Sequence, residues 1–167
     1  MITPALQSFI SRHRLPESYL SMAEKWFSPI LSEFGEHYGR EKSIQIIGIN
    51  GCQGSGKSTL ADYLCTQVKL QYGAATVSLS LDDFYLTKAE RTALAHDVHP
   101  LLAVRGVPGT HDIALAIDTV NSLKAGKRTL LTRFDKSTDD RTKAEDSVIM
   151  NGPIGLIVLE GWCFGAT

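Results

Sequence analysis

The N-terminal region carries apolar side chains at the three-and-four spacing of an amphipathic helix. The positions with this spacing are Leu20, Ala23, Phe27, Ile30, Leu31 and Phe34. Pro29 interrupts the pattern, and because Ser28 suits a helix cap and proline suits the first helical position, we expect the helix to kink or restart there. Residues 35–42 are polar and contain two glycines, which predicts a linker. The pattern therefore predicts a helical segment over residues 1–42 and a separate domain over residues 43–167.

Residues 44–81 follow the pattern of a strand, a helix and a second strand. Residues 44–49 are apolar and β-branched, which is typical of a buried parallel strand. Apolar side chains at helical spacing follow over residues 60–68, and residues 76–81 are the second predicted strand. Because such units cross over right-handedly, the pattern predicts an α/β fold, with a parallel sheet flanked by helices.

The remainder of the chain alternates between short elements and polar loops. The elements expected, in order, are a helix over 88–97, a loop over 98–110, a helix over 113–123, a strand over 129–132, a charged mobile loop over 133–146, and strands over 148–150 and 155–159. We expect residues 148–150 to pair back onto residues 129–132. The last strand is almost wholly apolar.

Composition excludes several classes of protein. The chain has 167 residues, of which 43% are hydrophobic and 21% are charged, as in an ordinary soluble domain. Its net charge of −1 gives no basic field for nucleic acid, and its apolar runs are too short to cross a membrane. The cysteines, Cys52, Cys65 and Cys163, lack metal-ligand spacing, so we expect reduced thiols in a cytoplasmic protein.

Residues 51–58 (GCQGSGKS) match the phosphate-binding pattern G-x-x-x-x-G-K-[ST] at every fixed position. Glycines let the backbone turn its N–H groups inward around an anion, and the following helix adds its positive end. Lys57 would reach the outer phosphates of a nucleotide, and the Ser58 hydroxyl would bind Mg²⁺. The strand before and the helix after favour this interpretation over a glycine-rich turn beside a lysine. The nucleotide-binding residues predicted are Gly51, Cys52, Gln53, Gly54, Ser55, Gly56, Lys57, Ser58 and Thr59.

A phosphate loop alone indicates only a bound nucleotide, whereas a kinase also needs a carboxylate that receives the proton of the acceptor hydroxyl. Asp82 follows the second predicted strand and is our candidate for this base. Glu160 follows the last apolar strand and would orient the Mg²⁺ shell, directly or through water. The alternatives are a helix cap or turn for Asp82 and Asp83, and a surface acid for Glu160. The catalytic residues predicted are therefore Lys57, Asp82 and Glu160, with Ser58 and Glu160 at the metal.

Four cations lie in loops that should open on one side of the sheet: Arg105, Arg133, Lys136 and Arg141. Guanidinium groups match carboxylate and phosphate oxygens in a bidentate fashion, so these residues would hold an acidic substrate. Ordinary surface charge is the alternative for each of them singly. His111 is open to two interpretations, a substrate contact or a polar residue at a helix start.

Four further segments together resemble one family. They are SLDDFY at 80–85, RGVPGTHD at 105–112, RFDKS at 133–137 and LEGWC at 159–163, in that order after the phosphate loop. This set is similar to the D-glycerate 3-kinase type of ATP-dependent P-loop kinase, a relative of uridine kinase, phosphoribulokinase and bacterial pantothenate kinase. The resemblance covers roughly residue 44 to the end of the chain.

The resemblance implies transfer of the γ-phosphate of ATP, with Mg²⁺, to a hydroxyl of a small hydroxy acid, glycerate being the first choice. It places the catalytic base on Asp82. The substrate-binding residues that it implies are Asp83, Tyr85, Arg105, His111, Asp112, Arg133, Asp135 and Lys136. A nucleoside or pantothenate-like acceptor is an alternative within the same group. An ATP-binding module without catalysis is an alternative of another class.

The sequence departs from this family after the EGW segment, where the family chain continues and this one stops at Thr167. In such kinases the third strand lies between the second and the first, and a fourth strand covers the first. We therefore expect an incomplete sheet in which residues 44–49 form an uncovered apolar edge, open to self-association. We also expect this chain alone to be a poor or inactive kinase, as a fragment or as half of an assembly completed by another chain.

Overall fold

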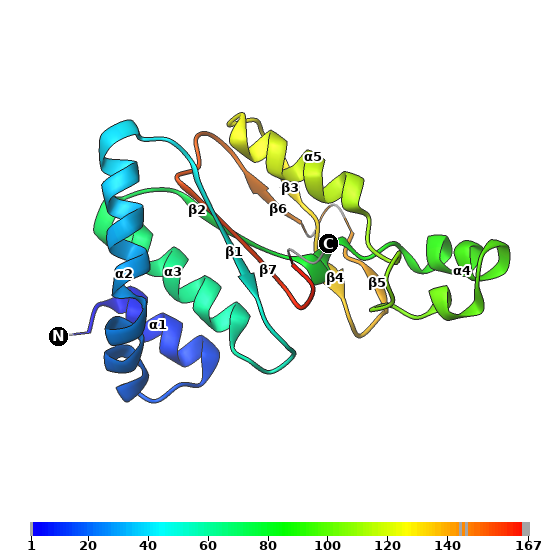
Figure 1. Cartoon of the computed structure of the whole chain (residues 1–167), viewed down its shortest axis with the longest axis horizontal. Coiled ribbons are helices and arrows are strands. Elements are labelled where there is room, and N and C mark those ends of the chain that lie inside the picture. The colour runs from blue at the N-terminus through cyan, green and yellow to red at the C-terminus, as the bar shows by residue number, and fades with distance from the viewer. Residues whose placement is uncertain (1, 144, 146, 165–167) are drawn as a thin grey trace. The chain divides into compact units, whose positions relative to one another are not determined.

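A computed structural model describes residues 2–143, 145 and 147–164 (Figure 1). The chain divides into two compact units. The first contains residues 1–78 and 154–167, and the second contains residues 79–153. Each unit has its own set of candidate functional residues.

The first unit begins with two helices, α1 (Pro4–His13) and α2 (Ser18–Glu41). The Thr3 side chain caps α1 by accepting a hydrogen bond from the Leu6 N–H at 3.3 Å. The predicted restart at Pro29 and the predicted linker over residues 35–42 are wrong, because α2 runs without a break through Pro29 to Glu41. Its buried apolar stripe continues on both sides of the proline, and this burial outweighs the one backbone hydrogen bond that Pro29 removes.

The sheet of the first unit has the order β1-β7-β2. Its strands are β1 (Gln45–Asn50), β2 (Thr76–Ser80) and β7 (Leu156–Gly161), and α3 (Lys57–Tyr72) connects β1 to β2. Strand β7 pairs in parallel with β1, from Gln45 opposite Leu156 to Asn50 opposite Gly161. The predicted place of the last strand between the first two is confirmed. It extends to Gly161, so Glu160 lies within the strand and not after it.

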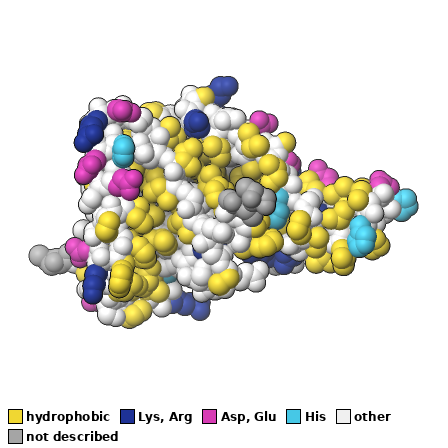
Figure 2. All heavy atoms as spheres, in the orientation of Figure 1, with side chains coloured by type: hydrophobic (Ala, Val, Ile, Leu, Met, Phe, Trp, Pro, Cys, Tyr) yellow, Lys and Arg dark blue, Asp and Glu magenta, His cyan; other side chains and the backbone are white. Residues whose placement is uncertain are grey.

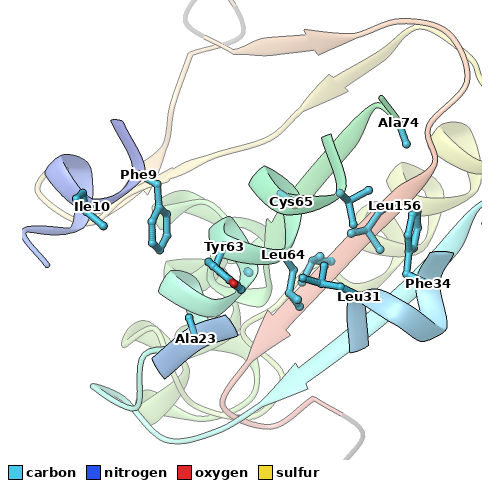
Figure 3. Close-up of a cluster of buried hydrophobic side chains, with 13 residues drawn as sticks. Phe9, Ile10, Ala23, Leu31, Phe34, Tyr63, Leu64, Cys65, Ala74 and Leu156 are labelled. Atoms are coloured by element: carbon cyan, nitrogen blue, oxygen red, sulfur yellow. The ribbon is translucent and has the colours of Figure 1, made fainter. Parts of the chain in front are cut away.

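A hydrophobic core joins the N-terminal helices to the sheet through α3 (Figures 1 and 3). Phe9 of α1 and Ala23 of α2 are fully buried in the same cluster as Leu64 of α3 and Leu156 of β7. The ring of Phe9 lies 5.8 Å from the ring of Tyr63, centroid to centroid. The N-terminal helices therefore belong to the core of the first unit, while a functional boundary near residue 42 stays a prediction.

Strand β1 lies at an edge of this sheet in the described part of the chain. Ile46, on this strand, keeps 44% of its surface exposed. Beside it, a groove of about 340 Å³ runs between β1 and α2, with Ile30 and Phe34 on its helical side. The predicted uncovered apolar edge is thus present among the described residues.

The second unit contains short helices and two small antiparallel strand pairs. Its elements are η1 (Leu81–Phe84), α4 (Lys88–Asp97), η2 (Pro100–Ala103), α5 (Ile113–Lys124), β3 (Thr129–Leu131), β4 (Phe134–Asp135), β5 (Asp140–Arg141) and β6 (Val148–Met150). The predicted helix over 88–97 is confirmed with the same bounds. The predicted pairing of β6 with β3 is also confirmed, with Thr129 opposite Met150.

The charged segment after β3 is more ordered than the sequence predicted. It forms a hairpin in which Phe134 of β4 lies opposite Arg141 of β5. Asp139 turns this hairpin with a positive φ of 57°. The fully buried Arg91 of α4 donates to the Asp139 carbonyl at 3.0 Å and to its carboxylate at 2.7 Å. These two bonds fix the turn, so the prediction of a mobile loop is wrong for the described residues.

The surface of the second unit has an apolar region around α4 and η2 (Figure 2). Val98, Leu101 and Val104 expose between 61% and 68% of their surfaces there. None of the described helices is long and apolar enough to span a membrane.

We predict that Phe9→Ala lowers the free energy of unfolding by about 3 kcal/mol or more, since a fully buried ring leaves a cavity in the shared core. Urea denaturation followed by circular dichroism measures this change. Trp26→Ala on α2 is the control, because Trp26 is 64% exposed and its loss should change little. Equal stabilities of the two variants would show that α1 contributes nothing to the core.

Candidate phosphate-binding and acceptor-binding sites

The loop between β1 and α3 leaves the start of the helix open. Gly54 and Gly56 have positive φ angles of 75° and 87°, which side chains with a Cβ rarely adopt. Gly56 is the residue before the first helical position, and no side chain caps α3 there. The first N–H groups of an α-helix lack partners within the helix. This end of α3 is therefore built to accept an anion.

Close contacts shape the same loop. A Cβ on Gly51 would lie 2.9 Å from the Ser55 Oγ, which explains glycine at this position. The Lys57 Nζ donates to the Cys52 carbonyl at 2.9 Å, so the ammonium group lies across the loop. The predicted nucleotide-binding residues thus share one short, largely exposed loop and the first turn of α3.

Ser58 and Glu160 meet at the base of the loop. The Ser58 hydroxyl donates to the Glu160 Oε1 at 2.8 Å, and the Glu160 side chain is held in the buried strand β7. A hydroxyl and a carboxylate are oxygen ligands of the kind that Mg²⁺ prefers, and Mg²⁺ takes few protein ligands, the others being phosphate and water. Among the described residues no group of three or more His, Cys, Asp or Glu side chains is placed to hold a metal. The pair fits a nucleotide-bound Mg²⁺ and not an all-protein metal centre.

A polar cluster that the sequence did not reveal connects α1 to the first turns of α3. Asp62 accepts a hydrogen bond from Arg12 at 2.8 Å and lies 2.7 Å from the His13 Nε2. The other ring nitrogen of His13 lies 3.4 Å from the Thr59 Oγ1, directly after Ser58. The cluster joins groups 46 to 50 residues apart, so no local pattern could have predicted it.

In the second unit, η1 holds the two aspartates that follow β2. Asp83 accepts from the Ser80 N–H at 3.2 Å, while the Ser80 Oγ accepts from the Asp82 N–H at 3.3 Å, and this capping box fixes the turn. The Asp82 Oδ2 lies 2.7 Å from the Lys136 Nζ, and Asp83 forms an ion pair with Arg133. Asp83 thus takes part in a capping box, its substrate-binding role stays a prediction, and Asp82 stays partly exposed to solvent beside a cation.

The start of α5 carries another paired acid, Asp112. Asp112 is the N-cap of α5 and accepts from the Leu115 N–H at 2.9 Å. Its other oxygen accepts from the Arg141 Nη2 at 2.9 Å, and the Arg141 Nε donates to the Tyr85 carbonyl at 2.9 Å. Arg141 thus ties the helix start to the segment after η1. Asp135, the remaining acid of the predicted set, accepts from the N–H and hydroxyl of Ser137, which lower its pKa.

His111 stacks on Tyr85, with ring centroids 4.3 Å apart and an interplanar angle of 25°. Its Nε2 atom is buried and has no hydrogen-bond partner among the described residues. Burial lowers the pKa of His111, against a smaller upward effect of the Asp82 charge, so the neutral ring is favoured. A neutral, unpartnered ring nitrogen is suited to contact a polar group of a ligand.

Sequence reasoning missed the cluster of Arg91, Arg105 and Asp139. Both arginines form ion pairs with the Asp139 carboxylate, Arg91 at 2.7 Å. Burial would raise the pKa of Asp139, but the hydrogen bond from Arg105 and the charges of both arginines outweigh it and lower this pKa. An arginine among polar residues in a predicted helix is usually exposed, so its burial had no signal in the sequence.

Each cation expected to bind an acidic substrate therefore has a carboxylate partner in the second unit. The pairs are Arg105 with Asp139, Arg133 with Asp83, Lys136 with Asp82, and Arg141 with Asp112. These pairs position the cations, and an incoming carboxylate would have to compete with the acids. The assigned roles of these residues stay predictions.

Comparison with known proteins agrees with the geometry. No family model matches the chain. The chain is 36% identical over 129 residues to an uncharacterized kinase (mug58) of Schizosaccharomyces pombe, and 35% identical over 134 residues to the chloroplastic D-glycerate 3-kinase of Arabidopsis thaliana. Both alignments cover 72% of this chain, but 46% and 28% of the respective relatives. The chain thus spans less than half the length of these curated relatives.

Among solved structures, a D-glycerate 3-kinase from Cryptococcus neoformans superimposes with a TM-score of 0.73 at 31% identity, over 86% of this chain and 53% of that one. The resemblance to P-loop kinases of the D-glycerate 3-kinase type is confirmed. A possible uridine kinase from Bacillus stearothermophilus, 22% identical, shares the fold with a TM-score of 0.55. The predicted α/β fold, with a parallel sheet flanked by helices, is confirmed with it.

We predict that stability depends on pH through His111. Because its folded-state pKa lies below the ordinary value of 6.5, the unfolded state binds more protons as the pH falls through that value, and stability is lost there. His111→Phe keeps a stacking ring without the titration, so its unfolding free energy should fall less between neutral and mildly acid pH. Urea titrations across this range measure the difference.

His96→Gln is the control for this prediction, because the His96 side chain is 90% exposed. Its curve should parallel that of the wild type. Parallel curves for wild type and His111→Phe would show that His111 titrates alike in the folded and unfolded chains.

Proposed function

We propose that this chain carries the catalytic core of an ATP-dependent kinase that phosphorylates a hydroxyl of a small hydroxy acid, glycerate being the first candidate. The observation that carries the proposal is the 2.8 Å contact between Ser58 and Glu160 beneath an uncapped glycine loop. A hydroxyl and an acid at this place are what a Mg²⁺–nucleotide needs, and they come from helix α3 and strand β7, which lie 102 residues apart at this contact. The kinase names of the relatives support the same reaction.

In the proposed reaction the loop N–H groups and Lys57 hold the phosphates of ATP. Ser58 and Glu160 would hold Mg²⁺, which neutralises charge on the β- and γ-phosphates when it is bound. The acceptor hydroxyl oxygen forms a bond to the γ-phosphorus, and the bond from that phosphorus to the β–γ bridging oxygen breaks. ADP leaves with the bridging oxygen, and the hydroxyl proton passes to the base.

Asp82 is the proposed base. A carboxylate accepts a proton only when ionised, and the Lys136 ammonium, 2.7 Å away, supplies a counter-charge. Lys136 is 61% exposed and on a flexible stem, so it can turn from Asp82 to a substrate carboxylate as the acceptor enters. The exchange would leave Asp82 free to receive the hydroxyl proton.

The acceptor would bind to the second unit through Arg105, Arg133 and Lys136, with the Tyr85–His111 stack as a neighbouring polar surface. Two relatives named D-glycerate 3-kinase support an acidic acceptor. All three cations already form ion pairs with acids of the protein, so an acidic acceptor would have to displace those acids. This observation favours a second candidate, a nucleoside or pantothenate-like acceptor. A relative from Dictyostelium discoideum, 28% identical, is named a uridine-cytidine kinase.

Two further proposals concern the state of the protein. Cys52, Cys65 and Cys163 are free thiols, which supports a reducing, cytoplasmic location. The open edge of β1, with Ile46 exposed, supports self-association through strand pairing.

We predict that Lys57→Ala abolishes both ATP binding and phosphoryl transfer, because the phosphates lose their only loop cation. Asp82→Asn should retain ATP binding within a few-fold and lower kcat by roughly 10²–10⁴, the usual range for a lost general base. Calorimetric ATP titration and ADP release with D-glycerate measure the two effects. Asp97→Asn, at an exposed acid of α4, is the matched control. ATP binding without turnover by the wild type would agree with the expected poor activity of this chain alone or with an ATP-binding module. Turnover by Asp82→Asn equal to that of the wild type would contradict the role of Asp82 as the base.

For self-association, we predict that the wild type dimerises with rising concentration and that Ile46→Lys stays monomeric, because a charge on an edge strand opposes pairing. Sedimentation velocity measures both. Leu70→Lys on α3 is the control, since Leu70 is 42% exposed and lies away from the edge strand. A wild type that remains monomeric at all concentrations would exclude this proposal.

A further inference from the structure

A cavity of about 450 Å³ lies between the phosphate loop and the N-terminal helices. Gly56, Lys57 and Thr59 line it on the side of the loop and α3. Tyr19, Met22 and Phe27 line it on the side of α2. The whole cavity lies within the first unit, so its walls belong to one compact body.

The helical wall of this cavity is held in place from two directions. On the side of the hydrophobic core, the ring centroid of Tyr19 lies 6.0 Å from that of the fully buried Phe9, and the ring centroid of Phe27 lies 6.1 Å from that of Tyr63. Beside the loop, His13 of α1 contacts both Asp62 and Thr59 of α3. The wall is therefore fixed against the helix that starts at the phosphate loop, and the cavity is present before any ligand binds.

The chemistry of the cavity matches the part of a nucleotide that the loop does not hold. A volume of about 450 Å³ falls within the usual range for small-ligand sites, which is roughly 300–1,000 Å³. Two aromatic rings and a thioether offer flat and adaptable apolar surface, on which a nucleobase can stack. Burial raises the pKa of Tyr19, so its hydroxyl stays protonated and can donate a hydrogen bond.

We propose that the N-terminal helices form the nucleoside site of this protein: the base and ribose lie against Tyr19 and Met22, and the phosphates lie on the loop beside Lys57. Gly56, Lys57 and Thr59 belong to the phosphate loop and the first turn of α3, and they also line the cavity. One ligand can therefore occupy the loop and the cavity together. The inference rests on the proposed function for the triphosphate. It gives the helical segment before β1 a role in binding and not only in packing.

The first test compares two ligands on the full chain by calorimetry with Mg²⁺: ATP, and inorganic tripolyphosphate, which has no nucleoside. ATP should bind at least about fivefold more tightly, because base–aromatic stacking typically accounts for roughly five- to hundredfold in affinity. Equal affinities would overturn the inference and leave the phosphate site intact. Binding of neither ligand would overturn the proposed function together with it.

The second test uses variants of the helical wall. Tyr19→Ala and Met22→Ala should each weaken ATP binding, Tyr19→Ala by roughly five- to hundredfold, while tripolyphosphate binding stays within twofold of the wild type. The unchanged tripolyphosphate affinity reports that the loop is still folded. Leu70→Ala is the matched control, because Leu70 is 42% exposed, like Met22 at 40%, and does not line the cavity.

The two ligands separate the roles of the residues. Lys57→Ala should weaken ATP and tripolyphosphate alike, unlike Tyr19→Ala and Met22→Ala. If Tyr19→Ala and Met22→Ala leave ATP affinity unchanged, the nucleoside does not lie in this cavity and the inference fails. If they weaken both ligands equally, the helices act on the loop structure alone, and the inference fails as well.

Discussion

The structure depends on the return of the chain to its first sheet as β7. This strand pairs in parallel with β1 along six residues and separates β1 from β2. Its apolar side chains are buried, so removing it would expose them to water at a cost of roughly 25 cal/mol for each Å². The same pairing carries Glu160 to the Ser58 hydroxyl, 102 residues earlier in the chain. A hydrophobic strand thus fixes the polar pair on which the proposed metal and phosphate chemistry depends.

The parts of this arrangement that the sequence predicted are local. Strand, glycine loop and helix over residues 44–72 follow from side-chain periodicity and from a motif whose glycines need unusual backbone angles. A helix restart was wrongly predicted as one possibility at Pro29, where burial of a long apolar stripe keeps the helix continuous. Sequence reasoning also failed at the hairpin after β3, whose order comes from Arg91, a buried arginine on a distant helix. Interactions between segments far apart in sequence leave no periodic pattern, so neither the polar cluster around Asp62 nor the ion pairs of the second unit could be predicted.

Those ion pairs change how the acceptor side is understood. Taken singly, Arg105, Arg133 and Lys136 look like open anion receptors, yet each is already neutralised by an acid held in a turn or at a helix cap. Partly exposed pairs of this kind contribute little to stability, but they hold long side chains in a defined place. Specificity would then reside in whether a ligand can replace an internal carboxylate with one of its own. A weakly charged or poorly shaped acceptor would leave the pairs closed.

The order of the strands also determines when the first unit can fold during synthesis. Strands β1 and β2 are not neighbours, and the strand that joins them follows an insertion of the whole second unit, residues 79–153. Pairings between such distant segments form slowly, because a long loop must close first. A ribosome that has made β1, α3 and β2 therefore displays two unpaired apolar strands until residue 161 has left the exit tunnel. In a nascent chain of this topology, the strand order itself prolongs the exposure of unpaired strands to chaperones and to other chains, whatever the final stability of the protein.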